Sequence, residues 1–347
     1  MSWEVVRAFL FIMISHGNII GHQKQVSQLM EDIEREHVAH AYLFVGPKHV
    51  GKFTIARWFA RELLLRGVPP DDRERVSHSI DRLLHPDFLV LDQLWIEEIC
   101  EDWALIAATS NVPQQHRAKA GVKTDVIGID DIRAIQERLY EARMGQFSCC
   151  LVRSVERMQV ASANAFLKIL EEPPEGRVFV LTTQSLSDLL PTVVSRMRKI
   201  HFTELPDAQL QSLLHQCSEE ERLFLLQCAH GAPGKLQHLL HNPDALRTER
   251  MMHAEALSFW RAEKLAQRLR LLKHLLKREG NADRFLFHLA LTVRDPGVHV
   301  SSPARRSLHE LCRSLQTNAH RELLVQRFAL ASMANDTKVD VKANVSW

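Results

Sequence analysis

A glycine-rich motif directly after an apolar run constrains the fold of this chain more than any other feature. Residues 46–52 read Gly-Pro-Lys-His-Val-Gly-Lys, the Gly-x-x-x-x-Gly-Lys pattern of a phosphate-binding loop. The run Ala41–Val45 before it predicts a buried strand, and residues 52–66 after it have helical spacing. A strand, a glycine loop and a helix in this order predict a P-loop domain, in which backbone amides, the helix N-terminus and Lys52 surround a phosphate.

Four further apolar runs alternate with helical patterns up to about residue 202. They are Phe88–Leu91, Cys149–Val152, Val178–Thr182 and Lys199–Phe202. Between them we expect helices at Asp130–Ala142 and Ala161–Leu170. Strands that alternate with helices predict an α/β fold built on a five-stranded, mostly parallel sheet.

Only helical patterns follow residue 202, so the chain divides into regions of different class. The expected helices are Asp207–Cys217, Glu219–Ala229, Lys235–Leu240, Leu257–Glu279, Ala282–Leu291, Ala304–Gln316 and Arg321–Met333. We therefore expect a P-loop domain over residues 1–203, a three-helix domain over 204–245, an all-α domain over 246–334 and a disordered tail over 335–347. Residues 1–15 have no assigned role.

The composition excludes several classes of protein. With 46% apolar and 25% charged residues over 347 positions, the chain can bury cores for two or three domains. The apolar stretch Ala8–Ile14 is too short to span a membrane and has no cleavage site, so we expect a cytoplasmic protein with no membrane partner. The six cysteines form no Cys-x-x-Cys pair, which argues against a metal site or a disulfide framework. A formal net charge of +2 leaves the partners open.

The residue after the loop lysine departs from what magnesium chemistry needs. That position normally carries a Ser or Thr hydroxyl that holds Mg²⁺, and here it is Phe53. Thr54 lies one residue further along the helix, a rotation of about 100°, so its hydroxyl should point elsewhere. We therefore predict a degenerate nucleotide-binding site. Its residues are Gly46, Gly51, Lys52 and Thr54. Residual ATP or ADP binding stays open, and no cofactor is expected to be required.

The third predicted strand lacks the acids that a working site needs. An aspartate at its end would position Mg²⁺, and a glutamate after it would polarise the attacking water. Here the two positions hold Arg153 and Ser154, so a positive charge stands where a carboxylate belongs. A competing interpretation takes Asp92 as the acid, although its strand follows the P-loop helix too directly. Glu156 is interpreted as a solvated acid at a helix start.

Residues 163–174 read Ala-Asn-Ala-Phe-Leu-Lys-Ile-Leu-Glu-Glu-Pro-Pro, which no simple periodicity explains. This segment resembles, nearly residue for residue, the signature of the bacterial clamp-loader AAA+ family. The signature residues are Asn164, Lys168, Glu171, Glu172, Pro173 and Pro174. Other pieces stand in the family's order: Gly21-His22-Gln23, His40–Phe44, His85–Phe88 and Ile129–Arg133. Together they cover most of residues 19–203.

The resemblance implies a fold and a role for one arginine. It implies an AAA+ domain followed by a small helical lid and a helical collar that holds an oligomer together. Ser195-Arg196-Met197 is similar to the family's Ser-Arg-Cys motif, whose arginine reaches into the ATP site of a neighbouring subunit. There a guanidinium can stabilise charge that develops on the transferred phosphoryl group. Arg196, together with Ser195, is therefore the predicted catalytic element, an arginine finger that acts in trans.

Within this family, the departures favour the delta-prime type of subunit. The P-loop hydroxyl and both acids are missing, whereas Ser195-Arg196 is kept. Residues 66–84 also contain no cysteine, unlike the zinc-bearing motor subunits. Thr182 and Thr183 stand at the family's first sensor and are interpreted as ordinary strand-end hydroxyls. A nucleotide role for Lys235, in the second-sensor region, stays open.

The function that the resemblance implies is a non-hydrolysing clamp-loader subunit of the DNA polymerase III holoenzyme, a nucleotidyltransferase. The chain alone would not be a competent ATPase. Its expected partners are the gamma/tau and delta types of subunit, a sliding clamp, and primed DNA through the assembly. Two alternatives stay open: an active ATPase that uses Thr54 and Asp92, and a purely structural adaptor. A basic segment that includes Arg261, Arg268 and Lys277 would suit DNA, although a solvated face is the simpler interpretation.

Overall fold

The chain forms two compact units, Met1–Leu236 and Gln237–Trp347. The structure, a computed structural model, describes residues 19–91, 110–112, 126–215, 217–276, 281–295, 297–298, 300–317 and 319–333. Residues 1–15, Asp92 and the predicted tail 335–347 lie outside the described residues. Across the described ranges, every helix is too short or too polar to cross a membrane. The predicted division at 203 and 245 stays a prediction.

A five-stranded sheet in the order β2-β3-β4-β1-β5 forms the centre of the first unit. The strands are β1 (Ala41–Val45), β2 (Phe88–Leu91), β3 (Ser148–Val152), β4 (Arg177–Thr183) and β5 (Arg198–His201). All four pairings are parallel. The predicted α/β fold is therefore confirmed, and every predicted strand ends within one residue of the observed one.

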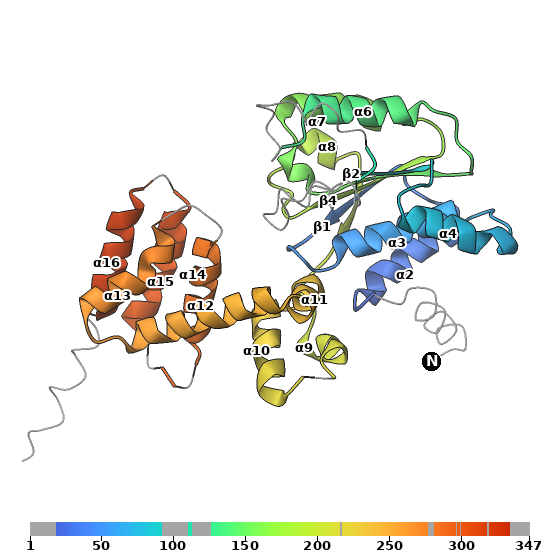
Figure 1. The fold of residues 1–347 in the computed structure, drawn as a ribbon. Helices are drawn as coiled ribbons and strands as arrows, with labels where there is room; N and C mark the ends of the chain where they lie inside the picture. The colour runs from blue at the N-terminus through green and yellow to red at the C-terminus, as the bar shows by residue number, and fades with distance from the viewer. Residues whose placement is uncertain are drawn as a thin grey trace, which may run out of the picture. The chain divides into compact units, whose positions relative to one another are not determined.

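Helices cover both faces of this sheet (Figure 1). One face carries α2 (Gln23–Glu34), α3 (Lys52–Leu64) and α4 (Arg73–Asp81), and the other carries α6 (Ile129–Leu139), α7 (Val160–Glu171) and α8 (Pro191–Val194). Alternate residues of β1 enter the two cores, with Tyr42 and Phe44 on the α3 side and Leu43 on the α7 side. Strands buried on both faces explain why the sequence shows continuous apolar runs rather than alternation.

Short helices follow the sheet. They are α9 (Asp207–Leu210), the 3₁₀ turn η5 (Gln211–Leu213), α10 (Glu219–Ala229) and α11 (Pro233–His241). The predicted helix Asp207–Cys217 is too long, because α9 ends at Leu210 and the chain continues as the 3₁₀ turn η5. Leu214, with φ −110° and ψ 20°, has left the helical conformation, and Ser218 then caps α10 by accepting a hydrogen bond from the amide of Glu221.

Apolar helix packing builds the second unit. Its elements are α12 (Pro243–Arg261), α13 (Leu265–Leu271), η6 (Leu272–Leu275), α14 (Asn281–Thr292), α15 (Ser302–Leu315) and α16 (Arg321–Met333). Helix α12 packs on α14, and α16 packs on both α13 and α15. In the core, the rings of Phe259 and Phe328 stack with centroids 5.4 Å apart.

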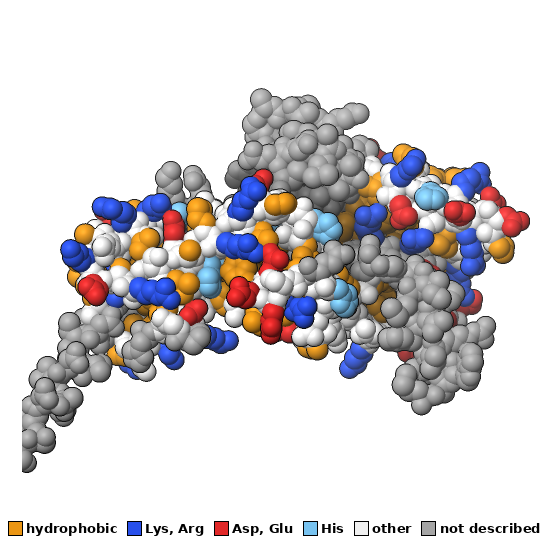
Figure 2. Space-filling view, turned by 60° about the horizontal axis from the view of Figure 1, so that its bottom comes forward, with side chains coloured by type: hydrophobic (Ala, Val, Ile, Leu, Met, Phe, Trp, Pro, Cys, Tyr) orange, Lys and Arg blue, Asp and Glu red, His pale blue; other side chains and the backbone are white. Residues whose placement is uncertain are grey.

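The predicted continuous helix Leu257–Glu279 is wrong, because helix α12 ends at Arg261. Ala262 adopts an extended conformation, and α13 begins only at Leu265. Buried Arg268 stabilises this break by donating from Nε to the Ala262 carbonyl (2.9 Å) and from a terminal nitrogen to Ser332 Oγ (2.9 Å). Arg268 is thus part of the core rather than of a DNA-facing surface. Figure 2 shows the remaining Lys and Arg side chains of the viewed face dispersed among acidic and apolar ones.

Candidate functional site

The loop after β1 requires glycine at both of its ends. Gly46 has φ 155°, and a Cβ there would lie 2.3 Å from the Phe202 carbonyl oxygen. Gly51, with φ 103°, is the N-cap of α3. Both backbone conformations are ones that only glycine adopts readily. The chain therefore folds the predicted phosphate loop between the sheet and the N-terminus of α3.

Lys52 bends back onto this loop. Its ammonium donates hydrogen bonds to the carbonyl oxygens of Gly46 (2.5 Å) and Pro47 (2.6 Å), and the side chain is buried. A lysine ammonium carries three donors, so two of them are committed to the loop's own backbone. In this conformation Lys52 stabilises the loop instead of extending toward a phosphate.

A cavity of about 170 Å³ opens beside the loop. Its lining comes from the loop and α3, from the carboxyl ends of β3 and β4, and from α11: Lys48, His49, Gly51, Lys52, Phe53, Thr54, Arg153, Ser154, Glu156, Thr182, Thr183, Gln184 and Gly234. The carboxyl ends of parallel strands meet at one edge of a sheet, which is where α/β proteins bind ligands. The predicted loop residues Gly51, Lys52 and Thr54 are thus brought together with the end of β3, as a nucleotide site requires.

The two residues that replace magnesium ligands contact each other inside this cavity. The guanidinium carbon of Arg153 lies 5.2 Å from the centre of the Phe53 ring, within the range of a cation–π interaction. Mg²⁺ needs oxygen ligands, and an aromatic ring stacked with a guanidinium supplies none. Phe53 and Arg153 therefore supply no ligand for Mg²⁺ at these two positions, and we derive no chemical step through one.

Glu156 lines the cavity, so its interpretation as a solvated acid is wrong. Ser154, in the left-handed conformation, turns the chain into the 3₁₀ helix η4 (Val155–Arg157), which returns Glu156 to the sheet edge. One carboxylate oxygen accepts a hydrogen bond from Gln184 Nε2 (3.0 Å), and the other is buried with no hydrogen-bond partner among the described residues. Sequence reasoning missed both side chains, because the turn at Ser154 has no glycine or proline to mark it.

The two threonines at the predicted first sensor, Thr182 and Thr183, line the cavity and form hydrogen bonds with the backbone. Lys235, in the second-sensor region, is not among the described residues that line the cavity. Thr182 Oγ1 accepts a hydrogen bond from the Ser154 amide (3.1 Å), and Thr183 Oγ1 donates one to the Ser185 carbonyl (3.0 Å). The two hydroxyls thus hold the turns at the strand ends. The amide of Gly234 donates to the His49 carbonyl (2.9 Å), which ties the start of α11 to the glycine loop.

Ser195 and Arg196 lie at the end of α8 and are not among the described residues that line the cavity. One terminal nitrogen of Arg196 donates to the Thr192 carbonyl (2.9 Å), and Ser195 Oγ donates to the same oxygen (3.0 Å). The other terminal nitrogen of Arg196 forms an ion pair with Glu171 Oε1 (2.7 Å). The Arg196 side chain is 37% exposed. The predicted finger therefore lies at the surface and outside its own cavity.

The signature segment forms most of α7 and divides into two faces. Its apolar residues Phe166, Ile169 and Leu170 are buried in the core on that side of the sheet, and Ala163 is also buried. Asn164, Lys168 and Glu171 are exposed. Their spacing of four and three residues places them along one side of the helix. After Glu171 the helix ends, and Glu172, Pro173 and Pro174 lead toward β4.

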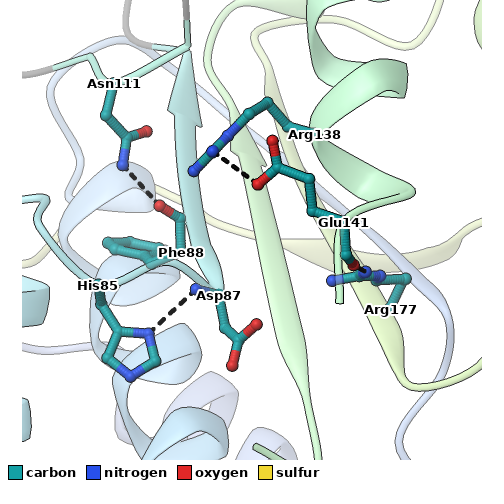
Figure 3. A network of polar contacts seen from close by, with 7 residues as sticks. All are labelled: His85, Asp87, Phe88, Asn111, Arg138, Glu141 and Arg177. Carbon is teal, nitrogen blue, oxygen red and sulfur yellow. Dashed lines mark hydrogen bonds and ion pairs between the residues drawn. The ribbon is translucent and has the colours of Figure 1, made fainter. Parts of the chain in front are cut away.

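The motif His85–Phe88 lies at the opposite edge of the sheet, where β2 begins (Figure 3). Asp87 Oδ2 accepts hydrogen bonds from the amides of Met144 (3.0 Å) and Gly145 (2.9 Å). His85 Nδ1 accepts one from the Asp87 amide (3.2 Å). Because the strands are parallel, this network is separated from the glycine loop by the length of the strands. It stabilises the loop before β3 and forms no part of the nucleotide site.

The sheet order, the glycine loop at its carboxyl edge and the helices on both faces define a P-loop protein of the AAA+ class. A sequence model of the family described as "DNA polymerase III, delta subunit" matches residues 21–206, more than half of the chain. The chain belongs to this family.

Individual relatives agree with this assignment. The gamma/tau subunit of DNA polymerase III from Mycobacterium tuberculosis is 28% identical over 209 residues, which make up 60% of this chain and 32% of that protein. The delta-prime subunit from Bacillus subtilis is 26% identical over 195 residues, 55% of this chain and 51% of that protein. This chain thus matches about a third of the length of the first relative and about half of the second. The predicted resemblance to clamp-loader AAA+ subunits is confirmed.

Among solved structures, a gamma subunit-related protein of DNA polymerase III from Thermotoga maritima is similar with a TM-score of 0.46 and 19% identity. The match covers 89% of this chain and 99% of that one. The fold assignment stands on the sheet and the glycine loop themselves.

Proposed function

We propose that this chain is a non-hydrolysing subunit of the clamp loader of the DNA polymerase III holoenzyme. In this proposal it donates Arg196 to the ATP site of a neighbouring ATPase subunit and helps to load a sliding clamp onto primed DNA. Its partners would be gamma/tau and delta types of subunit in a cytoplasmic hetero-oligomer. Membership of the family supports the clamp-loader part, and the geometry of two sites supports the rest.

The observation that carries the proposal is the stacking of Arg153 on Phe53 in the chain's own cavity. A working site needs a hydroxyl and a carboxylate at these positions, and the positive charge of Arg153 would repel Mg²⁺. ATP hydrolysis in this cavity would require both side chains to be rearranged or replaced.

The position of Arg196 supports action in trans. Because it lies outside the chain's own cavity and is partly exposed, a phosphate that it contacts would have to belong to another subunit. Its planar guanidinium offers several donors in a fixed fork, which suits the oxygens of a transferring phosphoryl group. A subunit can therefore contribute to catalysis with this side chain while its own nucleotide cavity is inactive.

Steady-state ATP hydrolysis by the complex reconstituted with its partner subunits, clamp and primed DNA tests the proposal. Arg196→Ala should lower the rate of ATP hydrolysis at the neighbouring subunit's site by about 10³-fold or more. Arg196→Lys should restore little of it, because a lysine lacks the planar fork. Lys52→Ala should leave turnover unchanged, like its control Lys48→Ala in the same loop.

Two results would favour the alternatives. Loss of this chain's own share of turnover in Lys52→Ala would identify an active ATPase. Normal ATP turnover and normal clamp loading by the Arg196→Ala complex would favour the alternative in which the chain is a purely structural adaptor. Sedimentation of each variant complex checks that its assembly is intact.

A further inference from the structure

Glu171, the last residue of α7, contacts the predicted arginine finger. Arg196 is fixed at two points: one terminal nitrogen contacts the Thr192 carbonyl of α8, and the other contacts the carboxylate of Glu171 on α7. The two distances, 2.9 Å and 2.7 Å, are those of well-formed hydrogen bonds. The guanidinium therefore bridges two helices that also pack against each other.

The anchor that Glu171 provides is rigid. Glu171 is the last residue of α7, and the residues just before it, Ile169 and Leu170, are buried in the core. Thr192 belongs to α8, which Val193 ties to the same core. Both contacts of Arg196 thus originate on elements that are fixed by packing rather than on a loose loop. A side chain held in this way keeps one orientation relative to the sheet.

Two contacts do not exhaust the donors of the guanidinium. Arg carries five N–H groups, and the hydrogen bonds to Thr192 and Glu171 use one terminal nitrogen each. With the side chain 37% exposed, the remaining donors can face a ligand outside the chain. An arginine ordered before a partner arrives loses less side-chain freedom on binding than a mobile one. The pair therefore preorganises Arg196 without saturating it.

We propose that Glu171 is a positioning residue, which orients Arg196 for the phosphoryl group in the neighbouring subunit's ATP site. This inference rests on the proposed function, because it assigns a role to a residue that contacts the finger. It also gives one acidic residue of the signature segment a task in catalysis. The adjacent Glu172 has left the helical conformation, with φ −125° and ψ 67°, and within the described residues it forms no ion pair with Arg196.

The pair Glu171 and Glu172 supplies a matched test in the reconstituted complex with clamp and primed DNA. Glu171→Ala should lower kcat for ATP about two- to fivefold, the range of an exposed ion pair. KM for ATP should not change, because an orientation needed only in the transition state affects kcat. Glu171→Gln keeps an oxygen that accepts the same hydrogen bond and should restore most of the rate. Glu172→Ala should match the wild type.

A double variant separates positioning from a general structural effect. In the Arg196→Ala background, Glu171→Ala should cause no further loss, because the side chain that it orients is gone. Circular dichroism and sedimentation should show that Glu171→Ala folds and assembles, as expected for a side chain that is half exposed.

Each contrary outcome has a separate meaning. If Arg196→Ala lowers ATP turnover and Glu171→Ala does not, the positioning role of Glu171 is wrong, while the proposed role of Arg196 is supported. Faster turnover by Glu171→Ala would mean that the carboxylate restrains Arg196, which also overturns the inference. If Arg196→Ala itself has wild-type turnover, the proposed function fails first.

Discussion

The nucleotide cavity and the corner formed by α7 and α8 differ in how their charged side chains are paired. In the cavity, the two replacements for magnesium ligands, Phe53 and Arg153, stack on each other. At the corner, Arg196 and Glu171 keep charged side chains at the surface, paired with each other. In the cavity the charged group packs on an aromatic ring, whereas at the corner both charged groups are partly exposed to solvent.

Under the proposed function, this difference explains how a chain of this fold could lose one activity and retain another. The cavity lies at the carboxyl ends of the strands, and its residues would serve a ligand bound to this chain. The corner lies outside the cavity lining and would serve a neighbouring chain. Substitutions in the first region therefore need not disturb the second. The two regions can be tested separately, and the three predictions below run from the largest expected effect to the smallest.

The largest change in stability should come from substitutions in the glycine loop of the cavity. Gly46→Ala should lower the free energy of unfolding by about 3 kcal/mol or more, because a Cβ there would lie 2.3 Å from the Phe202 carbonyl oxygen and φ is 155°. Gly51→Ala meets no atom within 4 Å and has only its φ of 103° against it, so about 1–2 kcal/mol is expected. Urea unfolding followed by circular dichroism compares the two. Equal losses would mean that the close approach to Phe202 relaxes easily.

The second prediction tries to undo the difference between cavity and corner. The double variant Phe53→Thr with Arg153→Asp removes the stack and supplies a hydroxyl and a carboxylate where Mg²⁺ needs them. We expect it to bind ATP at least about tenfold more tightly with Mg²⁺ than with a chelator, a difference of roughly 1.4 kcal/mol. The wild type should show no such dependence on Mg²⁺. Titration with a fluorescent ATP analogue measures both.

Its controls are the single variants Phe53→Thr and Arg153→Ala, neither of which supplies both ligands. If the double variant stays independent of Mg²⁺, the block lies in the glycine loop instead. The contacts of Lys52 with the Gly46 and Pro47 carbonyls would then be the next to test.

The sequence predicted the sheet of the first unit well, because its strands are defined locally. Continuous apolar runs bounded by polar residues identify strands that are buried on both faces, and so each strand was placed within one residue. The Gly-x-x-x-x-Gly-Lys spacing identified the loop, and the defect inferred from Phe53 and Arg153 stays a prediction. That these two side chains stack could not be read from the sequence, since they are 100 residues apart and meet only through the pairing of strands.

Three features that the sequence did not reveal share a cause, which is a side chain that interacts with residues elsewhere in the fold. The break after Arg261 contains neither glycine nor proline, and it is stabilised by Arg268 bonded both to Ala262 and to α16. The return of Glu156 to the cavity depends on the turn at Ser154 and on Gln184, the residue after β4. The contact of Arg196 with Glu171 likewise joins residues 25 positions apart. Local periodicity contains none of these partners.

The smallest effect concerns a histidine behind the glycine loop and sharpens the contrast with the exposed corner. Buried His22 lies 2.8 Å from the Val50 carbonyl oxygen through Nε2, and its ring meets the edge of Phe202 at 5.0 Å. Burial lowers the pKa of His22 below its ordinary value of 6.5, and the hydrogen bond to Val50 offsets part of this shift. The unfolded chain therefore binds the proton more readily than the folded chain does.

From this sign, the contribution of His22 to stability is fully present above pH 6.5 and is lost as the pH falls from there toward the lower pKa of the folded state. Each unit of difference between the two pKa values is worth about 1.4 kcal/mol. His22→Gln keeps an N–H that can donate to the Val50 carbonyl but does not titrate, so its unfolding free energy should change less between pH 7 and pH 5. Exposed His37→Gln is the control and should follow the wild type. Parallel curves for wild type and His22→Gln would mean that the loop opens to let His22 take up a proton, and that the cavity region is less rigid than its packing indicates.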